Sequence, residues 1–209
     1  MFVCVVDYGM GNIRSVQNAF ELLGVKTILT KNKKELSDSD GIILPGVGAF
    51  QDGMKNLHKD NFIDFLTEMV IDKKKPYLGI CLGLEFLAEK SFENGEHDGF
   101  GWIKGEIKKI TPDSSSYKIP HMGWNDTQII SSGGLLSELD DASFYFLHSY
   151  YFQVDELEKS CITSICDYGG IPITATLQKN NIFATQFHPE KSQLSGLKLL
   201  KNFLDIVDV

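Results

Sequence analysis

The chain has 209 residues, of which 43% are hydrophobic and 11% aromatic, and its formal net charge at pH 7 is −8. A chain of this length and composition can bury a core of its own, which excludes a disordered protein. The negative charge, without any stripe of basic and aromatic residues, argues against a nucleic-acid partner. No apolar run approaches the roughly 18 residues of a membrane span, so we expect no membrane partner either.

The four cysteines have no CxxC pair and no metal-ligand spacing to histidine; they are Cys4, Cys81, Cys161 and Cys166. We therefore predict no metal site, no cofactor and a reducing, cytoplasmic setting. The opening "MFVCVVDYGMGN" lacks a basic segment and is more typical of a first strand than of a signal peptide.

The first 90 residues alternate short apolar runs with amphipathic segments. The apolar runs predict strands at residues 2–8, 25–30, 41–46 and 76–81. Helical spacing predicts helices at 12–24, with Asn12 as N-cap and Gly24 as the stop, at about 54–70, and again after residue 81. Such alternation implies a parallel sheet covered on both faces.

The second half has strand-like runs joined by short turns, among them "PHMGWND", "SFYFLHSYYF" and "IPITATLQ". "QKNNIF" is a hairpin candidate, and "SGLKLLKNFLDIV" predicts a final helix. The predicted fold is thus α/β: an open, mostly parallel, flavodoxin-like sheet flanked by helices, with antiparallel strands added in the C-terminal half. We expect residues 1–209 to form a single domain. For most aromatic and histidine side chains of the first two runs, His121 and His148 included, we favour a place in an aromatic core.

Cys81 lies in "GICLG", a Gly-x-Cys-x-Gly pattern formally like the nucleophile elbow of hydrolases. A sharp strand-to-helix turn needs glycines at positions 79 and 83 because the backbones pack closely there. At such a turn the backbone N–H of Leu82 can face a developing oxyanion, and the helix N-terminus favours a reactive thiolate. A buried structural cysteine is the alternative interpretation.

A nucleophilic thiolate needs a base, and the base needs an orienting partner. Among the five histidines, His188 lies in "ATQFHPEKS" at the end of an apolar run. Pro189 restricts it to an extended conformation, so that Glu190 points to the same side and can hold the imidazole. A surface turn is the alternative, but together with the elbow the pattern favours a Cys81–His188–Glu190 triad.

Two glycine-rich stretches, "DYGMGN" and "LPGVGAFQDG", also follow predicted strands. Neither matches a dinucleotide-binding or P-loop pattern. We interpret "PGVG" as backbone N–H groups brought close to a ligand at the carboxyl end of the sheet, where Val47 or Gly48 could supply a second oxyanion donor.

Taken together, "DYGMGNIRSV", "LPGVGAFQDGM", "GICLG", "PHMGWN", "YFLHSYY" and "QFHPEKS" resemble class I, triad-type glutamine amidotransferases. "DYGMGN", "PHMGWN" and "HPEKS" are most similar to the glutaminase subunits of imidazole glycerol phosphate synthase. The resemblance covers nearly the whole chain.

The resemblance implies glutamine as the substrate, Cys81 as nucleophile, His188 as general base and acid, and Glu190 as its orienting partner. It implies that the backbone around Ser149 and Tyr150 holds the substrate's α-carboxylate. It also implies a heterodimer with a (β/α)₈-barrel cyclase subunit, which would receive the ammonia in histidine biosynthesis. The residues that correspond to the family's interface are Asn12, Trp124, Tyr145 and Lys191.

Glu85 departs from the resemblance, because the family usually has glutamine at this position. A residue four positions after Cys81 lies on the same helix face and leans towards the helix N-terminus. We expect Glu85 to approach the active site, where it could bind the substrate ammonium and would oppose thiolate formation by like-charge repulsion.

Three other functions compete with this one. A paralogous glutaminase could feed ammonia to an enzyme that modifies surface sugars, and Glu85 gives that alternative some weight. A Cys–His peptidase or glyoxalase-like hydrolase is disfavoured by the carboxylate two residues after His188. A non-catalytic binding module would leave the Cys81 and His188–Glu190 patterns unexplained.

Overall fold

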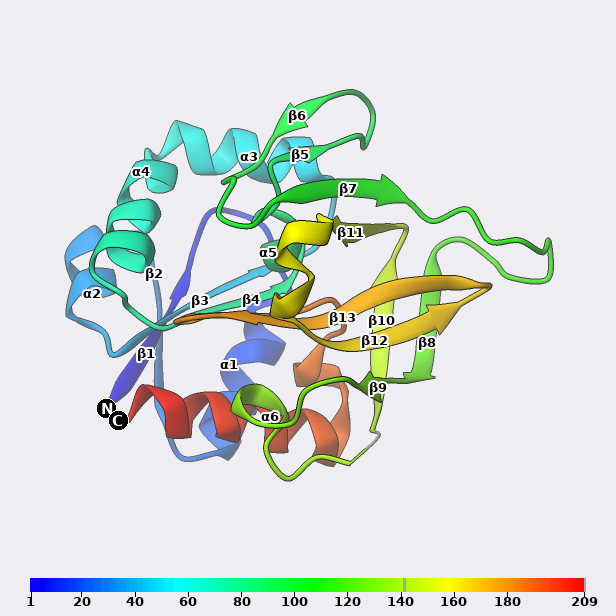
Figure 1. Ribbon diagram of the computed structural model, residues 1–209. Helices are drawn as coiled ribbons and strands as arrows, with labels where there is room; N and C mark the ends of the chain where they lie inside the picture. Colours follow the sequence, from blue (N-terminus) through cyan, green and yellow to red (C-terminus); the bar gives the residue numbers. More distant parts are fainter. Residues whose placement is uncertain (141, 209) are drawn as a thin grey trace.

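A central eight-stranded sheet, in the order β2-β1-β3-β4-β14-β13-β12-β9, organises the molecule (Figure 1). The computed structural model describes residues 1–140 and 142–208. Five neighbouring strands run parallel: β2 (Lys26–Thr30), β1 (Phe2–Val6), β3 (Gly41–Gly46), β4 (Tyr77–Cys81) and β14 (Ile182–Thr185). The predicted parallel α/β sheet is therefore confirmed.

The sheet continues as antiparallel strands on the side of β14, as the second half of the sequence predicts. These are β13 (Ile171–Lys179), β12 (Ile162–Tyr168) and β9 (Gln128–Ile129). The "QKNNIF" hairpin joins β13 to β14, and Asn180 takes the left-handed conformation at its turn, with φ of 56°. Asparagine tolerates this conformation better than most residues, so the turn fixes the register of β14.

Helices cover both faces of the sheet because alternate residues of each strand point to opposite faces. Val3 and Val5 of β1 belong to one apolar cluster, whereas Cys4 and Val6 belong to the other. The first cluster packs against α1 (Ile13–Leu22) and α6 (Gln193–Val207), and the second packs against α3 (Phe50–Lys59) and α4 (Phe62–Thr67), on opposite sides of the sheet (Figure 1).

The remaining helices are short: α2 (Lys33–Asp38), a π-helical turn η1 (Glu68–Asp72), α5 (Leu82–Glu85), and the 3₁₀ turns η2 (Gly134–Leu136), η3 (Glu156–Cys161) and η4 (Pro189–Lys191). The continuous helix expected over about 54–70 is wrong, because Asn61 adopts φ of 51° and separates α3 from α4. The helix after Cys81 exists but has only four residues.

Two smaller sheets border the carboxyl end of the main sheet. β8 (His121–Asp126) pairs with β10 (Ser143–His148), and β11 (Tyr150–Val154) joins β7 (Gly105–Lys109), β5 (Lys90–Ser91) and β6 (His97–Asp98). "SFYFLHSYYF" is thus two strands that separate at Ser149 and enter different sheets. No helix in the described part of the chain is long and apolar enough to cross a membrane.

Close backbone contacts explain the two glycines that flank Cys81. A Cβ atom at Gly83 would lie 1.8 Å from the Leu44 carbonyl oxygen, and one at Gly79 would lie 2.4 Å from the Gly83 carbonyl oxygen. Real Cβ contacts this short do not occur, so α5 sits against β3 and β4 only because both positions lack side chains.

We predict that Gly83→Ala destabilises the protein by more than about 3 kcal/mol, at the large end of single substitutions, because backbone atoms must separate. Chemical denaturation measures the change. Gly101→Ala is the matched control: Gly101 has φ of 66° but no atom within 4 Å of its virtual Cβ. The control should lose only about 1–2 kcal/mol from the left-handed backbone. Equal losses for the two variants would contradict the steric explanation.

Candidate active site

Three adjacent parallel strands deliver the predicted catalytic residues to one edge of the sheet. β3 lies next to β4, and β4 lies next to β14. Val47 directly follows β3, Cys81 ends β4, and His188 lies three residues beyond β14. Because carboxyl ends of parallel strands meet at the same edge, residues far apart in sequence converge there.

Cys81 occupies the strained turn that the Gly-x-Cys-x-Gly pattern predicts. Its φ of 55° and ψ of −105° are rarely adopted by a residue with a side chain. The residue is 5% exposed, and its Sγ donates to the Leu147 carbonyl oxygen at 3.8 Å. Leu82 begins α5, so its N–H has no acceptor within the helix and is free to face a ligand beside Cys81.

His188 and Glu190 form a buried pair. Nδ1 of His188 lies 2.8 Å from Oε1 of Glu190, and the two side chains are 2% and 1% exposed. Nε2 of His188 is buried without a hydrogen bond of ordinary geometry among the described residues. Burial alone would lower the pKa of His188, but the neighbouring Cys81 and Glu190 outweigh it and raise that pKa to about 10.

This arrangement can transfer a proton from the thiol to the imidazole. A histidine whose cationic form is stabilised by a carboxylate on one side is a strong base towards a thiol on the other. The resulting thiolate is a nucleophile, and the imidazolium can later protonate a leaving group. The three residues therefore provide what acyl transfer to a cysteine requires.

A pocket of about 220 Å³ opens beside Cys81. It contains every residue predicted for oxyanion or substrate binding, and its lining is Val47, Gly48, Cys81, Leu82, Glu85, Glu93, Pro120, Leu147, His148, Ser149 and Tyr150. Gly48 has φ of 110°, and a Cβ there would meet Met10 Cε at 2.8 Å. Val47 and Gly48 of the "PGVG" loop thus line the pocket beside Cys81.

Glu85 is a buried carboxyl that lines this pocket. It is 5% exposed, and its Oε1 accepts a hydrogen bond of 3.0 Å from Nε2 of Gln186. Burial raises the pKa of Glu85 to about 8, although the hydrogen bond from Gln186 lowers it. Near neutral pH this side chain is therefore mostly uncharged, which weakens the like-charge repulsion expected from the sequence.

Two polar residues of the site were missed by sequence reasoning. Glu93 lines the pocket, and its Oε2 accepts the Phe50 N–H at 2.6 Å; nothing in "SFENGE" marks it in the sequence. Gln186 also approaches Cys81, with 4.0 Å between Nε2 and Sγ. A signal existed for Gln186, because residue 186 shares a side of the extended chain with His188.

Three of the four residues predicted for the partner interface gather near β8 and β10. The Trp124 and Tyr145 rings contact edge to face at 6.4 Å, and Nζ of Lys191 lies 5.7 Å from the Tyr145 ring centroid. Trp124 is 49% exposed. Asn12 precedes α1 and accepts from Ser15, which lines the same shallow hollow as Lys191.

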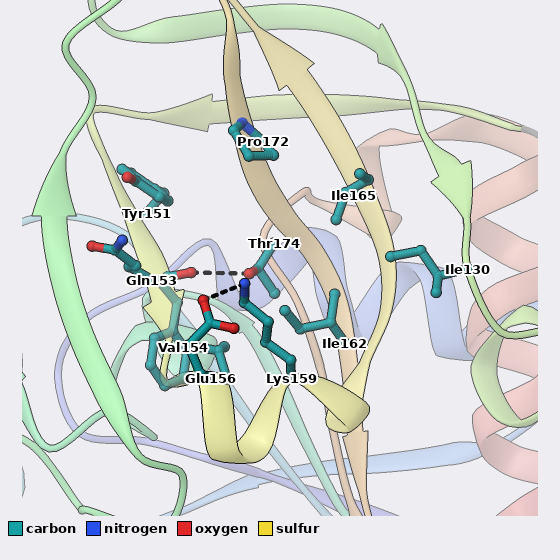
Figure 2. A pocket seen from close by; sticks show the side chains of 11 residues that line it. Ile130, Tyr151, Gln153, Val154, Glu156, Lys159, Ile162, Ile165, Pro172 and Thr174 are labelled. Carbon is teal, nitrogen blue, oxygen red and sulfur yellow. Dashed lines mark hydrogen bonds and ion pairs between the residues drawn. The ribbon is translucent and has the colours of Figure 1, made fainter.

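A second, larger cavity of about 410 Å³ lies between β11, η3 and the β12–β13 hairpin (Figure 2). Three of its polar side chains are already paired: the Thr174 hydroxyl donates to the Phe152 carbonyl, and Lys159 forms an ion pair with Glu156. The cavity contains none of the residues predicted for catalysis, so size does not mark the active site here. No group of three His, Cys, Asp or Glu among the described residues is placed to hold a metal ion.

Known proteins share this sequence and this fold. The family profile of class-I glutamine amidotransferases matches residues 4–207. The chain is 45% identical to "Imidazole glycerol phosphate synthase subunit HisH 1" of Campylobacter jejuni strain RM1221, over 97% of this chain and 98% of that one. It is also 45% identical to the HisH subunit of Bacillus cereus strain B4264, over 99% and 95%. A crystal structure of a glutamine amidotransferase superposes over 100% of both chains, with a TM-score of 0.75 and 18% identity.

The chain belongs to the class-I glutamine amidotransferase family. Within that family its similar relatives are HisH subunits, with 45% identity over nearly their full length. The resemblance found in the sequence motifs is thereby confirmed.

We predict that Glu85→Gln removes a pH-dependent loss of stability. The folded-state pKa of Glu85, about 8, lies above the ordinary carboxyl value of 4.5, so the folded state retains a proton that the unfolded chain loses. The stabilisation is complete below pH 4.5 and is lost as pH rises through about 8. Thermal unfolding measured at several pH values should therefore show that the stability of the variant rises relative to that of the wild type as pH increases from 4.5 to about 8.

The matched control is Glu93→Gln, which changes a more exposed carboxylate of the same pocket. A stability difference between wild type and Glu85→Gln that stays constant with pH would contradict the protonated state of Glu85.

Proposed function

We propose that this protein hydrolyses glutamine to glutamate and ammonia through a thioester on Cys81, and that the ammonia passes to a synthase subunit that makes imidazole glycerol phosphate in histidine biosynthesis. The observation that carries the proposal is the Cys81–His188–Glu190 arrangement, with Cys81 in the wall of a pocket of amino-acid size. The assignment to histidine biosynthesis rests on the 45% identity to HisH subunits.

In the first step His188 takes the Cys81 proton, and the thiolate attacks the carbon of the glutamine side-chain amide. The C=O electron pair moves onto oxygen and gives a tetrahedral oxyanion. The N–H of Leu82 and a donor at Val47 or Gly48 stabilise this charge, and one such donor is typically worth ~10²–10³ in rate. Glu190 holds the imidazole throughout and stabilises its cationic form.

The C–N bond then breaks, and the His188 imidazolium gives its proton to the leaving nitrogen, which departs as ammonia. A water molecule, deprotonated by His188, attacks the thioester carbon. The second oxyanion collapses with loss of the Cys81 thiolate, which takes the proton back from His188, so glutamate is released and the enzyme returns to its starting state. No metal or redox group is required for these steps.

The pocket walls are suited to the amino-acid end of glutamine. We assign the α-carboxylate to the Ser149–Tyr150 backbone, where the chain passes from β10 to β11. For the α-ammonium we favour Glu93 over Glu85, because Glu85 is buried and mostly protonated whereas Glu93 is only partly buried. This revises the substrate-binding role considered for Glu85.

A glutaminase that only released ammonia would lose its product to solvent. We therefore infer a heterodimer with a (β/α)₈-barrel cyclase subunit. The exposed Trp124, with Tyr145 and Lys191 beside it, is the surface we assign to that partner, together with Asn12. Tryptophan and tyrosine are enriched among interface hot spots.

The nucleophile assignment predicts that the glutamine-like electrophile 6-diazo-5-oxo-L-norleucine labels Cys81 alone. The other cysteines are buried, and burial raises the pKa values of Cys161 to about 11 and Cys166 to about 12, which keeps both thiols protonated. Peptide mapping by mass spectrometry locates the label. Cys81→Ser should abolish both labelling and glutamine hydrolysis, whereas Cys166→Ser should change neither. Labelling at any other cysteine would contradict the glutaminase proposal.

The partner assignment predicts that a barrel cyclase raises ammonia release and that Trp124→Ala weakens the complex by about 2 kcal/mol or more, the size of an interface hot spot. Titration calorimetry measures the affinity. Leu157→Ala, which truncates a residue 81% exposed outside the proposed interface, is the control and should leave affinity unchanged. If ammonia release is raised instead by an enzyme that aminates a surface sugar, the assignment to histidine biosynthesis would be wrong, and the proposed glutaminase chemistry would stand.

A further inference from the structure

Two buried histidines next to the pocket have no part in the triad chemistry. His121 and His148 are 2% and 6% exposed and lie opposite each other at the end of the β8–β10 pair. Nδ1 of His121 is 2.9 Å from Nε2 of His148, and Nδ1 of His148 is 2.7 Å from the Tyr150 carbonyl oxygen. An aromatic core, expected from the sequence, explains their burial but not this chain of polar contacts.

The hydrogen bonds fix the tautomer of both rings. A carbonyl oxygen can only accept, so His148 must carry its proton on Nδ1. Its Nε2 then accepts, and the donor is Nδ1–H of His121. The remaining nitrogen, Nε2 of His121, accepts from Nδ2 of Asn125 at 3.3 Å. Every link therefore runs in one direction, from Asn125 through both imidazoles to Tyr150.

The orientation of Asn125 is itself fixed by two backbone contacts. Its Nδ2 also donates to the Asp167 carbonyl at 3.1 Å, and its Oδ1 accepts the Asp126 N–H at 2.9 Å. A flipped amide would lose both bonds. The backbone of β8 and β12 therefore fixes Asn125, the first donor of this hydrogen-bond chain.

Packing holds both rings in place and keeps them neutral. His121 is stacked between Tyr168, at 3.9 Å between centroids, and Phe146, at 4.7 Å. Burial lowers the pKa of His121 to about 4 and that of His148 to about 3. An imidazolium would have a donor at every nitrogen and would break the one-way chain, so the geometry and the neutral state agree.

The hydrogen-bond chain ends at Tyr150, in the wall of the proposed glutamine pocket. His148, Ser149 and Tyr150 all line it, and the carbonyl of Leu147 accepts from the Cys81 thiol. This wall is where two sheets separate, because β10 ends at His148 and β11 begins at Tyr150. The Ile110 N–H of the β7 side donates to the Ser149 carbonyl at 2.9 Å, and the side chain of His148 adds a second bond to the bend, at the Tyr150 carbonyl.

We propose that the His121–His148 pair is a positioning device that holds the Ser149–Tyr150 backbone in the conformation that binds the α-carboxylate of glutamine. The inference rests on the proposed glutaminase function. The two histidines are positioning residues: they act through the Tyr150 carbonyl and exchange no proton with the substrate. Their loss should raise KM for glutamine and leave the reactivity of Cys81 intact.

The first test reads the tautomers directly. Two-bond ¹H–¹⁵N spectra of the full-length protein, labelled at histidine, should show His121 and His148 with protonated Nδ1 and bare Nε2, which is the minor tautomer in water. A proton on Nε2 of His148 would overturn the proposal. The measurement does not depend on activity, so it separates failure of this inference from failure of the glutaminase function.

The second test uses the two amide replacements of His148. Asn places an N–H donor near the position of Nδ1 and keeps the link to Tyr150, whereas Gln places its carboxamide near Nε2 and loses that link. In the complex with the cyclase subunit, His148→Gln should raise KM for glutamine about tenfold, as expected for one buried hydrogen bond, with kcat within about threefold. His148→Asn should restore most of the loss. Iodoacetamide labelling of Cys81 should proceed at the wild-type rate in both.

His121→Phe removes the donor to His148 but preserves stacking on Tyr168 and Phe146, and it should give a smaller rise in KM. The control is Asn202→Leu, which deletes buried bonds to the Leu135 and Ser137 carbonyls far from the pocket and should change stability but not KM. Equal KM for both His148 variants and wild type, or a fall in labelling rate without a rise in KM, would overturn the proposal. If His148→Gln does not fold, the KM values of His148→Asn and His121→Phe are compared instead, together with the tautomer spectra. A KM for His121→Phe equal to that of the wild type would then overturn the proposal.

Discussion

The contact between Gly83 and the Leu44 carbonyl sets the position of the nucleophile and of the helix N-terminus beside it. It brings the first turn of α5 against β3, and the chain can make that approach only by turning sharply at Cys81. The strained dihedral angles of Cys81 are thus imposed by packing on both sides. Because the turn is held by buried backbone, the thiol cannot relax into a more common conformation.

The second catalytic strand is positioned by a different device. β14 is placed beside β4 by parallel pairing and by the Asn180 hairpin that joins it to β13. Beyond its end, the His188 N–H donates to the Tyr145 carbonyl at 2.9 Å, which turns the segment towards Cys81. The nucleophile thus depends on the parallel core, whereas the base depends on the antiparallel additions, and the pocket forms where the two meet.

Much of this could be predicted because local patterns determine it. The alternation of strand and helix, the Gly-x-Cys-x-Gly turn and the extended His188–Glu190 pair all follow from residues close together in sequence. The break between α3 and α4 could not, because Asn61 enters the left-handed region without glycine or proline to mark it. Glu93 and the His121–His148 pair were missed for another reason: the tertiary fold alone brings Phe50 to Glu93, and it alone brings the two histidines together. The charge of Glu85 likewise depends on burial, which the sequence does not state.

The contacts of Tyr145 have a consequence for solubility as well as for catalysis. In an antiparallel strand the N–H and C=O of one residue point to the same edge, and Tyr145 turns both away from β8. Its N–H donates to the Ser192 hydroxyl, and its C=O accepts from His188. The catalytic segment therefore occupies part of an edge where another chain could add a strand. A change that releases this segment would therefore have two effects. It would displace the catalytic His188, and it would expose unpaired backbone groups of β10 to pairing with another chain.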